Sequence, residues 1–161
     1  MLVPSDQLPV GLELPKIISV VCRQGYSLMR YSGHDTVERI TRELTQSALL
    51  VHSLERVSAE KMDPLFQDSL EVLLHPSESR VFIEQNFSKV LHEKISQVSL
   101  VGFQLQQDAQ VSAQVLSLLS KEGIKVLRLT SHSQSITVLL SDGDASKAVA
   151  ALHRFFIEER H

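Results

Sequence analysis

The side chains in this sequence that could carry chemistry are seven histidines and a single cysteine. Zinc sites hold their ligands at short, fixed spacings, but no two of these histidines stand at i, i+4 on an expected helix and none has cysteine support. The histidines are His34, His52, His75, His92, His132, His153 and His161. We therefore expect structural or surface histidines, no metal site and no cofactor. Cys22 lies inside an apolar run and is interpreted as a core residue rather than a nucleophile.

The stretch "SGHD" at 32–35 places a histidine beside an acid, but neighbours in sequence are not an oriented catalytic triad. No nucleophile elbow, GxxxxGK[ST] loop or GxGxxG fingerprint accompanies it. We interpret "SGHD" as a strand-to-helix turn in which Asp35 sits at the positive end of a helix. The sequence thus predicts binding rather than catalysis.

Two loops that open helices are the candidate seats for a small ligand: "RYSGHD" at 30–35 and "QLQQDAQ" at 104–110. The first N–H groups of a helix have no partner within the helix, and the helix dipole favours negative charge there, so such a loop suits a carboxylate. Ordinary caps with nothing bound are an equally valid interpretation of either loop alone.

Two periodic segments in the second half predict helices packed on a core. The first ends in a polar turn followed by Gly123, and the second begins after Asp142-Gly143-Asp144, where either carboxylate could cap it. Their apolar faces consist of Val111, Val115, Leu118 and Leu119 in the first and of Ala145, Ala148, Val149, Leu152 and Phe156 in the second. In the first half, Val37, Ile40 and Leu44 form a looser face of the same kind.

Strands rich in β-branched residues recur in two copies, for "SLEVLLHP" at 69–76 matches "SITVLLSD" at 135–142. Each is followed by a helix-like segment ending in phenylalanine. Further strands are "KIISVVCR", "YSLMRYS", "QVSLVGF" and "KVLRLTS", with a hairpin turn expected at Gln24-Gly25 between the first two. Each copy runs strand, helix, strand, strand, helix. This order predicts an α+β protein of two βαββαβ-like units, with helices on one face of antiparallel sheets.

Composition narrows the classes of partner. Sixteen Lys plus Arg against nineteen Asp plus Glu leave a net charge of -3, which offers no footprint for nucleic acid. Apolar runs are far shorter than the roughly 20 residues of a membrane span. A lone cysteine excludes an intrachain disulfide, so we expect a cytoplasmic protein.

Residues 1–16, with three prolines, are expected to form a linker, and the extra "RVSAEKMDPLFQD" at 56–68 is expected to be a mobile loop or a partner contact.

The second copy resembles the tandem ACT domains in the C-terminal regulatory region of aspartate kinase (aspartokinase). The resemblance rests on the opening "VSLVG", on "EGIKV", on the polar corner after "LRL" and on the closing "DASKAVAALHRFF". In the first copy, "IISVVCRQGYSLMRYSG" is similar to the family's first regulatory hairpin. The resemblance implies ferredoxin-like ACT units at 17–96 and 97–161, with 17–24 possibly completing the sheet of the second.

The resemblance also implies a regulatory amino-acid sensor without the kinase catalytic core. Paired ACT units would bind an end-product such as lysine or threonine, form a homodimer and restrain an aspartate kinase catalytic domain by feedback inhibition. Asp35 or Asp108 would hold the effector's ammonium group, and N–H groups at the helix starts would hold its carboxylate. The implied effector-binding residues are Met29, Tyr31, Ser32, Gly33, His34 and Asp35 in the first copy, and Asp108, Ala109, Gln110, Val111, Thr130, Ser131 and Ser133 in the second.

This sequence departs from the family at the corners. Many relatives carry Pro-Gly where this chain has Ala109-Gln110, and an acidic residue where it has Ser133. The stretch "LLVHSLERV" at 49–57 lacks the Thr-Ser-Glu corner often found in the first copy. An alternative interpretation is therefore a degenerate ACT pair that serves only in oligomerisation, without a ligand.

Overall fold

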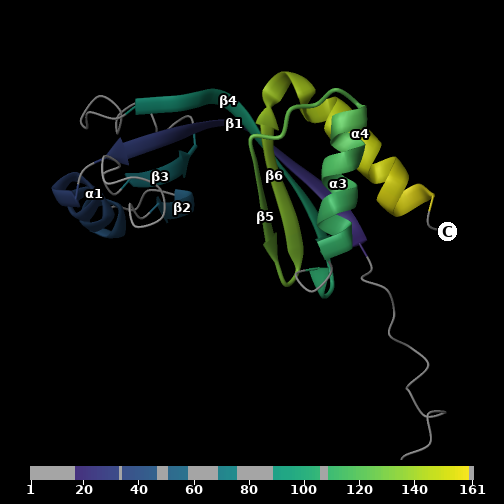
Figure 1. Cartoon of the computed structure of the whole chain (residues 1–161), viewed down its shortest axis with the longest axis horizontal. Helices are drawn as coiled ribbons and strands as arrows, with labels where there is room; N and C mark the ends of the chain where they lie inside the picture. Colours follow the sequence, from purple (N-terminus) through teal and green to yellow (C-terminus); the bar gives the residue numbers. More distant parts are fainter. Residues whose placement is uncertain are drawn as a thin grey trace, which may run out of the picture. The chain divides into compact units, whose positions relative to one another are not determined.

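The computed structural model describes residues 17–32, 34–46, 51–57, 69–75, 89–105 and 109–159 (Figure 1). Its elements are β1 (Ile17–Ser32), α1 (His34–Gln46), β2 (Val51–Val57), β3 (Ser69–Leu74), β4 (Lys89–Gly102), α3 (Ala109–Lys121), β5 (Arg128–His132), β6 (Ser135–Ser141) and α4 (Ala145–His153). A 3-10 turn at Asp142–Asp144 precedes α4, and a π-helical turn at Arg154–Glu158 follows it. The predicted α+β class is confirmed.

The strands follow the hydrogen-bonded order β2-β3-β1-β4-β6-β5. The β1–β3 and β2–β3 pairs are antiparallel, and Ser32 of β1 is opposite Ser69 of β3. The chain divides into two compact units. Unit 1 takes its described residues from 17–21, 98–138 and 146–159, and unit 2 takes its described residues from 22–97 and 139–145.

Unit 2 has a core between α1 and the strands β1 and β3. The helix contributes Val37, Ile40 and Leu44, which are spaced three and four residues apart as expected for one helical face. The strands contribute Met29, Tyr31, Leu70, Val72 and Leu74. Because these strand residues alternate along β1 and β3, they lie on the same face of the sheet and close the core against α1.

Unit 1 has a second core, in which α3 and α4 cover one face of the sheet (Figure 1). Buried residues alternate along the strands, with Val98 and Leu100 in β4 and Ile136 and Val138 in β6. From the helices come Val111, Val115, Leu119, Ala148, Leu152 and Phe156, all of which are buried. On the opposite strand face, the hydroxyls of Ser99 and Thr137 are hydrogen-bonded at 2.8 Å. Of the predicted apolar faces, Leu118 and Val149 are half-buried and the other residues are buried.

The C-terminus of α3 is closed by a glycine. The Gly123 N–H donates to the Ser120 carbonyl and the Ile124 N–H donates to the Leu119 carbonyl, both at 2.9 Å. Gly123 has φ +71, the left-handed conformation that this type of helix end requires. Ile124 is buried, so the chain returns to the core directly after the turn.

The hairpin predicted at Gln24-Gly25 is wrong, because β1 runs unbroken from Ile17 to Ser32. A two-residue hairpin turn of type I′ needs positive φ at both central residues, and here only Gly25 has it, at +83. The glycine produces a local irregularity without reversing the chain. β4 is also longer than predicted, since it begins at Lys89 rather than near Gln97.

Several predictions fall outside the described residues. These are the linker at 1–16, the helix-like segment that ends at Phe87, and residues 58–68 of the extra loop. No described helix is long and apolar enough to cross a membrane. Across the same ranges, no three histidine, cysteine, aspartate or glutamate side chains gather in a group that could hold a metal ion.

Candidate functional site

The second-copy candidate site lies where the end of β4 meets the β5–β6 turn. The Gly102 N–H donates to the Gln134 carbonyl at 2.9 Å, and the Leu105 N–H donates to the Ser133 carbonyl at 3.0 Å. Between these two donors, Gln104 adopts a positive φ of +56. The hydrogen bonds therefore hold residues 102–105 against the β5–β6 turn.

Around this corner the predicted residues differ in exposure. Ala109, Gln110, Thr130 and Ser133 are exposed, Val111 is buried in the core, and Asp108 lies outside the described residues. Ser131 is half-buried, and its Oγ is enclosed with no hydrogen-bond partner among the described residues. A buried hydroxyl without a partner is uncommon, because leaving it unpaired costs free energy.

The start of α3 adds hydrogen-bond donors to the same corner. The first N–H groups of a helix have no partner within the helix, and the helix dipole favours negative charge there. From Ala109 onward, the first turn of α3 itself contains no acidic side chain. The Ser131 hydroxyl and these N–H groups suit an anionic group such as a carboxylate. Thr130 is the preceding residue of β5, so its side chain points to the opposite face of the sheet.

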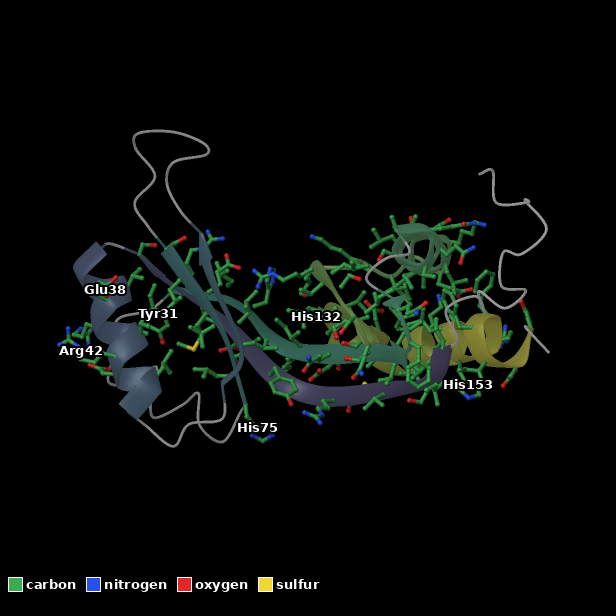
Figure 2. All side chains as sticks on the ribbon, turned by 90° about the horizontal axis from the view of Figure 1, so that it is seen from below. Tyr31, Glu38, Arg42, His75, His132 and His153 are labelled. Carbon is green, nitrogen blue, oxygen red and sulfur yellow. The ribbon has the colours of Figure 1, made fainter. Side chains whose placement is uncertain are left out.

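The first-copy candidate site is built differently. Met29 and Tyr31 point into the core, and Figure 2 shows Tyr31 directed toward α1. Ser32 is exposed at the end of β1. Gly33 and the side chains of His34 and Asp35 lie outside the described residues. Only Ser32 among the predicted first-copy residues therefore has a described side chain at the surface.

Two polar groupings were not anticipated from the sequence. In unit 2, Arg30 donates from Nε to Glu71 Oε1 at 3.0 Å, and Glu71 is only 4% exposed. Asp142 Oδ1 accepts hydrogen bonds from the Gly25 N–H at 3.2 Å and from Ser96 Oγ at 2.6 Å. A glutamate inside the apolar run "SLEVLL" was the available signal for the first, because charged residues are rarely buried without a partner.

Cys22 lies beside the Asp142 grouping. Burial raises the pKa of its thiol, a hydrogen bond with the Ser96 side chain opposes this shift, and the nearby charge of Asp142 adds to it. A thiol with a raised pKa is a poor nucleophile at neutral pH, so Cys22 does not supply a reactive centre.

Comparison with known proteins finds similarity to one domain family and to aspartokinases. The ACT domain family model matches residues 98–156. The aspartokinase of Rickettsia felis is 33% identical over 63 residues, which are 39% of this chain and 16% of that protein. The chain thus spans less than one fifth of the length of this curated relative.

Solved structures agree on the fold. The regulatory subunit of aspartate kinase from Thermus flavus has a TM-score of 0.70 at 15% identity, and the match covers 88% of this chain and 99% of that one. Aspartokinase III of E. coli in complex with lysine and aspartate has a TM-score of 0.62 at 17% identity, with 91% of this chain and 35% of that one covered. The match therefore extends over almost the whole regulatory subunit but only about a third of the E. coli kinase. These matches show that the chain shares the fold of aspartate kinase regulatory subunits, and the family model shows that residues 98–156 resemble an ACT domain.

Proposed function

We propose that this chain is a regulatory region of aspartate kinase and that it senses an end-product amino acid, with lysine or threonine as the first candidates, at the corner between α3 and the β5–β6 turn. The observation that carries the proposal is the Leu105–Ser133 hydrogen bond, which holds the lead-in to α3 against the polar corner. The E. coli aspartokinase III structure contains lysine, which supports lysine as one candidate.

In the proposed binding mode, N–H groups at the start of α3 hold the effector's carboxylate and Ser131 Oγ donates to it. Asp108 would hold the ammonium group of the effector. The first-copy loop, with Ser32, Gly33, His34 and Asp35, is a second proposed contact region.

Regulation would follow from differential binding. An effector that binds one arrangement of the ACT units more tightly stabilises that arrangement and so restrains an aspartate kinase catalytic domain. We propose that the two ACT units correspond to residues 17–96 and 97–161, that residues 17–24 complete the sheet of the second, and that the protein acts as a cytoplasmic homodimer.

Calorimetric titration of the chain with lysine and with threonine tests this proposal. We expect saturable binding that Ser131→Ala weakens by about fivefold, the effect of one lost hydrogen bond. Ser117→Ala, which changes an exposed serine on α3, is the matched control and should leave binding unchanged. Absence of heat with both amino acids at millimolar concentration contradicts the sensor function.

A second candidate function is oligomerisation without a ligand. It is favoured by the exposed apolar side chains of unit 1, which include Ile18 and Val21 on β1, Phe103 after β4 and Leu116 on α3. Phe103 is 59% exposed. An aromatic side chain that stays exposed loses the favourable free energy of burial, unless another surface covers it. If sizing shows a dimer that Phe103→Ser dissociates, while no amino acid shifts the unfolding temperature, this second function is the correct one.

A further inference from the structure

The carboxylate of Asp142 joins two long strands of unit 2 at one point. Its Oδ1 accepts one hydrogen bond from the backbone of β1, at Gly25, and one from the Ser96 hydroxyl of β4. Ser96 is 0% exposed, so this hydroxyl cannot turn to water instead. A single oxygen atom therefore fixes β1 and β4 against the turn that precedes α4.

Both strands depart from regular geometry close to this oxygen. Gly25 has φ +83, and Lys94, two residues before Ser96, has φ +53. Left-handed backbone is unfavourable for a residue with a Cβ atom, because that atom approaches the following carbonyl oxygen. Lys94 is exposed, so burial of its side chain does not compensate for this conformation. The backbone at Lys94 must be held by neighbouring contacts. These are the pairing of β4 with β1 and β6 and, two residues further on, the side-chain hydrogen bond from Ser96 to Asp142.

We propose that Asp142 is a conformational pin: by holding Gly25 and Ser96 it keeps Lys94 in the left-handed conformation, and its release lets β4 relax into a regular strand. β4 then has a pinned form and a released form. A strand with two forms is an element that a regulatory ligand can bias, a last step that rests on the proposed function. The pin itself is testable without any effector, so its failure is distinct from failure of the sensor function.

A double-mutant cycle between Asp142 and Lys94 tests the pin. Glycine adopts positive φ freely, so Lys94→Gly should raise the unfolding temperature of the chain by about 1–3 °C while the pin holds. In the Asp142→Ala background, where β4 is released, the same change should lower the unfolding temperature, because glycine weakens a regular strand. Asp142→Ala alone should lower it by about 5–10 °C, through loss of two hydrogen bonds to a charged group.

Amide hydrogen exchange supplies a local readout and Asp144 a matched control. Exchange at the Gly25 N–H should accelerate at least tenfold in Asp142→Ala and should stay unchanged in Asp144→Ala, which removes a carboxylate from the same turn. Asp142→Asn keeps an accepting oxygen and should retain most of the Gly25 protection. If the alanine variant does not fold, Ser96→Ala, which removes the β4 hydrogen bond to Asp142, takes its place in the cycle. Equal effects of Lys94→Gly in both backgrounds, or equal loss of protection in Asp144→Ala, would overturn the pin.

Discussion

Arg30 and Glu71 form an ion pair in which two nitrogen atoms of the guanidinium group, Nε and Nη2, donate to the same carboxylate oxygen. The two residues are direct neighbours in the β1–β3 register. Their exposure is unequal, because the Arg30 side chain is 40% exposed and that of Glu71 only 4%. Most of the desolvation cost therefore falls on the carboxylate, and the arginine is the partner that offsets it.

Replacing Arg30 should destabilise unit 2. Arg30→Met removes the cation from a buried carboxylate, and we expect a loss of about 1–3 kcal/mol, below the value for a fully buried pair because water reaches the arginine. Arg39→Met is the matched control, since the Arg39–Glu43 pair is exposed on α1 and should contribute less than about 0.5 kcal/mol. Urea unfolding measures both variants, and equal losses would contradict the asymmetry.

Cys22 should make stability fall at high pH. Because burial raises the pKa of its thiol, the folded chain keeps the proton at a pH where the unfolded chain loses it. The stabilising contribution is complete below the unfolded pKa and is lost as pH rises above about 8.5 toward the folded value. Unfolding followed between pH 7 and 10 should show a steeper fall for the native chain than for Cys22→Ala. Parallel curves for the two proteins would rule out this role of the thiol.

Replacing either of two leucines of α3 by alanine should lower the free energy of unfolding by very different amounts. Leu119 is fully buried in the core of unit 1 and Leu116 is 42% exposed. Leu119→Ala creates a cavity and should cost about 2–5 kcal/mol, whereas Leu116→Ala should cost less than about 1 kcal/mol. Denaturant midpoints of the two variants, with unchanged slopes, check the difference. A cost for Leu116→Ala that equals the cost for Leu119→Ala would show that a surface not described here covers Leu116.

Replacing either of two glycines by alanine should also change the stability of the chain by different amounts. Gly123→Ala should cost about 1 kcal/mol, because a Cβ atom at φ +71 is strained even though no atom lies within 4 Å of its position. Gly143→Ala would place its Cβ 3.8 Å from Ser141 Oγ, an ordinary contact, so its stability should change by less than about 0.5 kcal/mol. Thermal unfolding of both variants makes the comparison, and an equal response would refute the conformational cause.

The parts of the fold that follow local periodicity were predictable from the sequence. The faces of α3 and α4 were identified because side chains three and four residues apart must lie together on a helix. The hairpin at Gln24-Gly25 was wrong because a glycine beside a polar residue suits a strand irregularity as well as a turn. The choice between the two depends on partners that the local sequence does not show.

The polar groupings show still more clearly that the local sequence does not reveal the distant partners of a residue. Asp142 precedes a helix and was interpreted as a possible cap, yet its hydrogen-bond partners are Gly25, 117 residues away, and Ser96, 46 residues away. For the second-copy candidate site, the resemblance indicated both the start of α3 and the corner at Thr130 to Ser133. The structure adds the Leu105–Ser133 hydrogen bond, which ties the chain shortly before α3 to this corner. Effector contact by the individual side chains stays a prediction.

The division of the strands between the two units has a consequence for synthesis. Unit 1 needs residues 17–21, which leave the ribosome early, and residues 98–138 and 146–159, which leave it late. Residues 17–21 of β1 therefore stay unpaired, as a partly apolar segment, until the second half of the chain is translated. Pairing between segments so distant in sequence is slow, and exposed strands promote aggregation while they wait. Unit 1 is therefore expected to be the last part of the nascent chain to form and the most in need of chaperone protection.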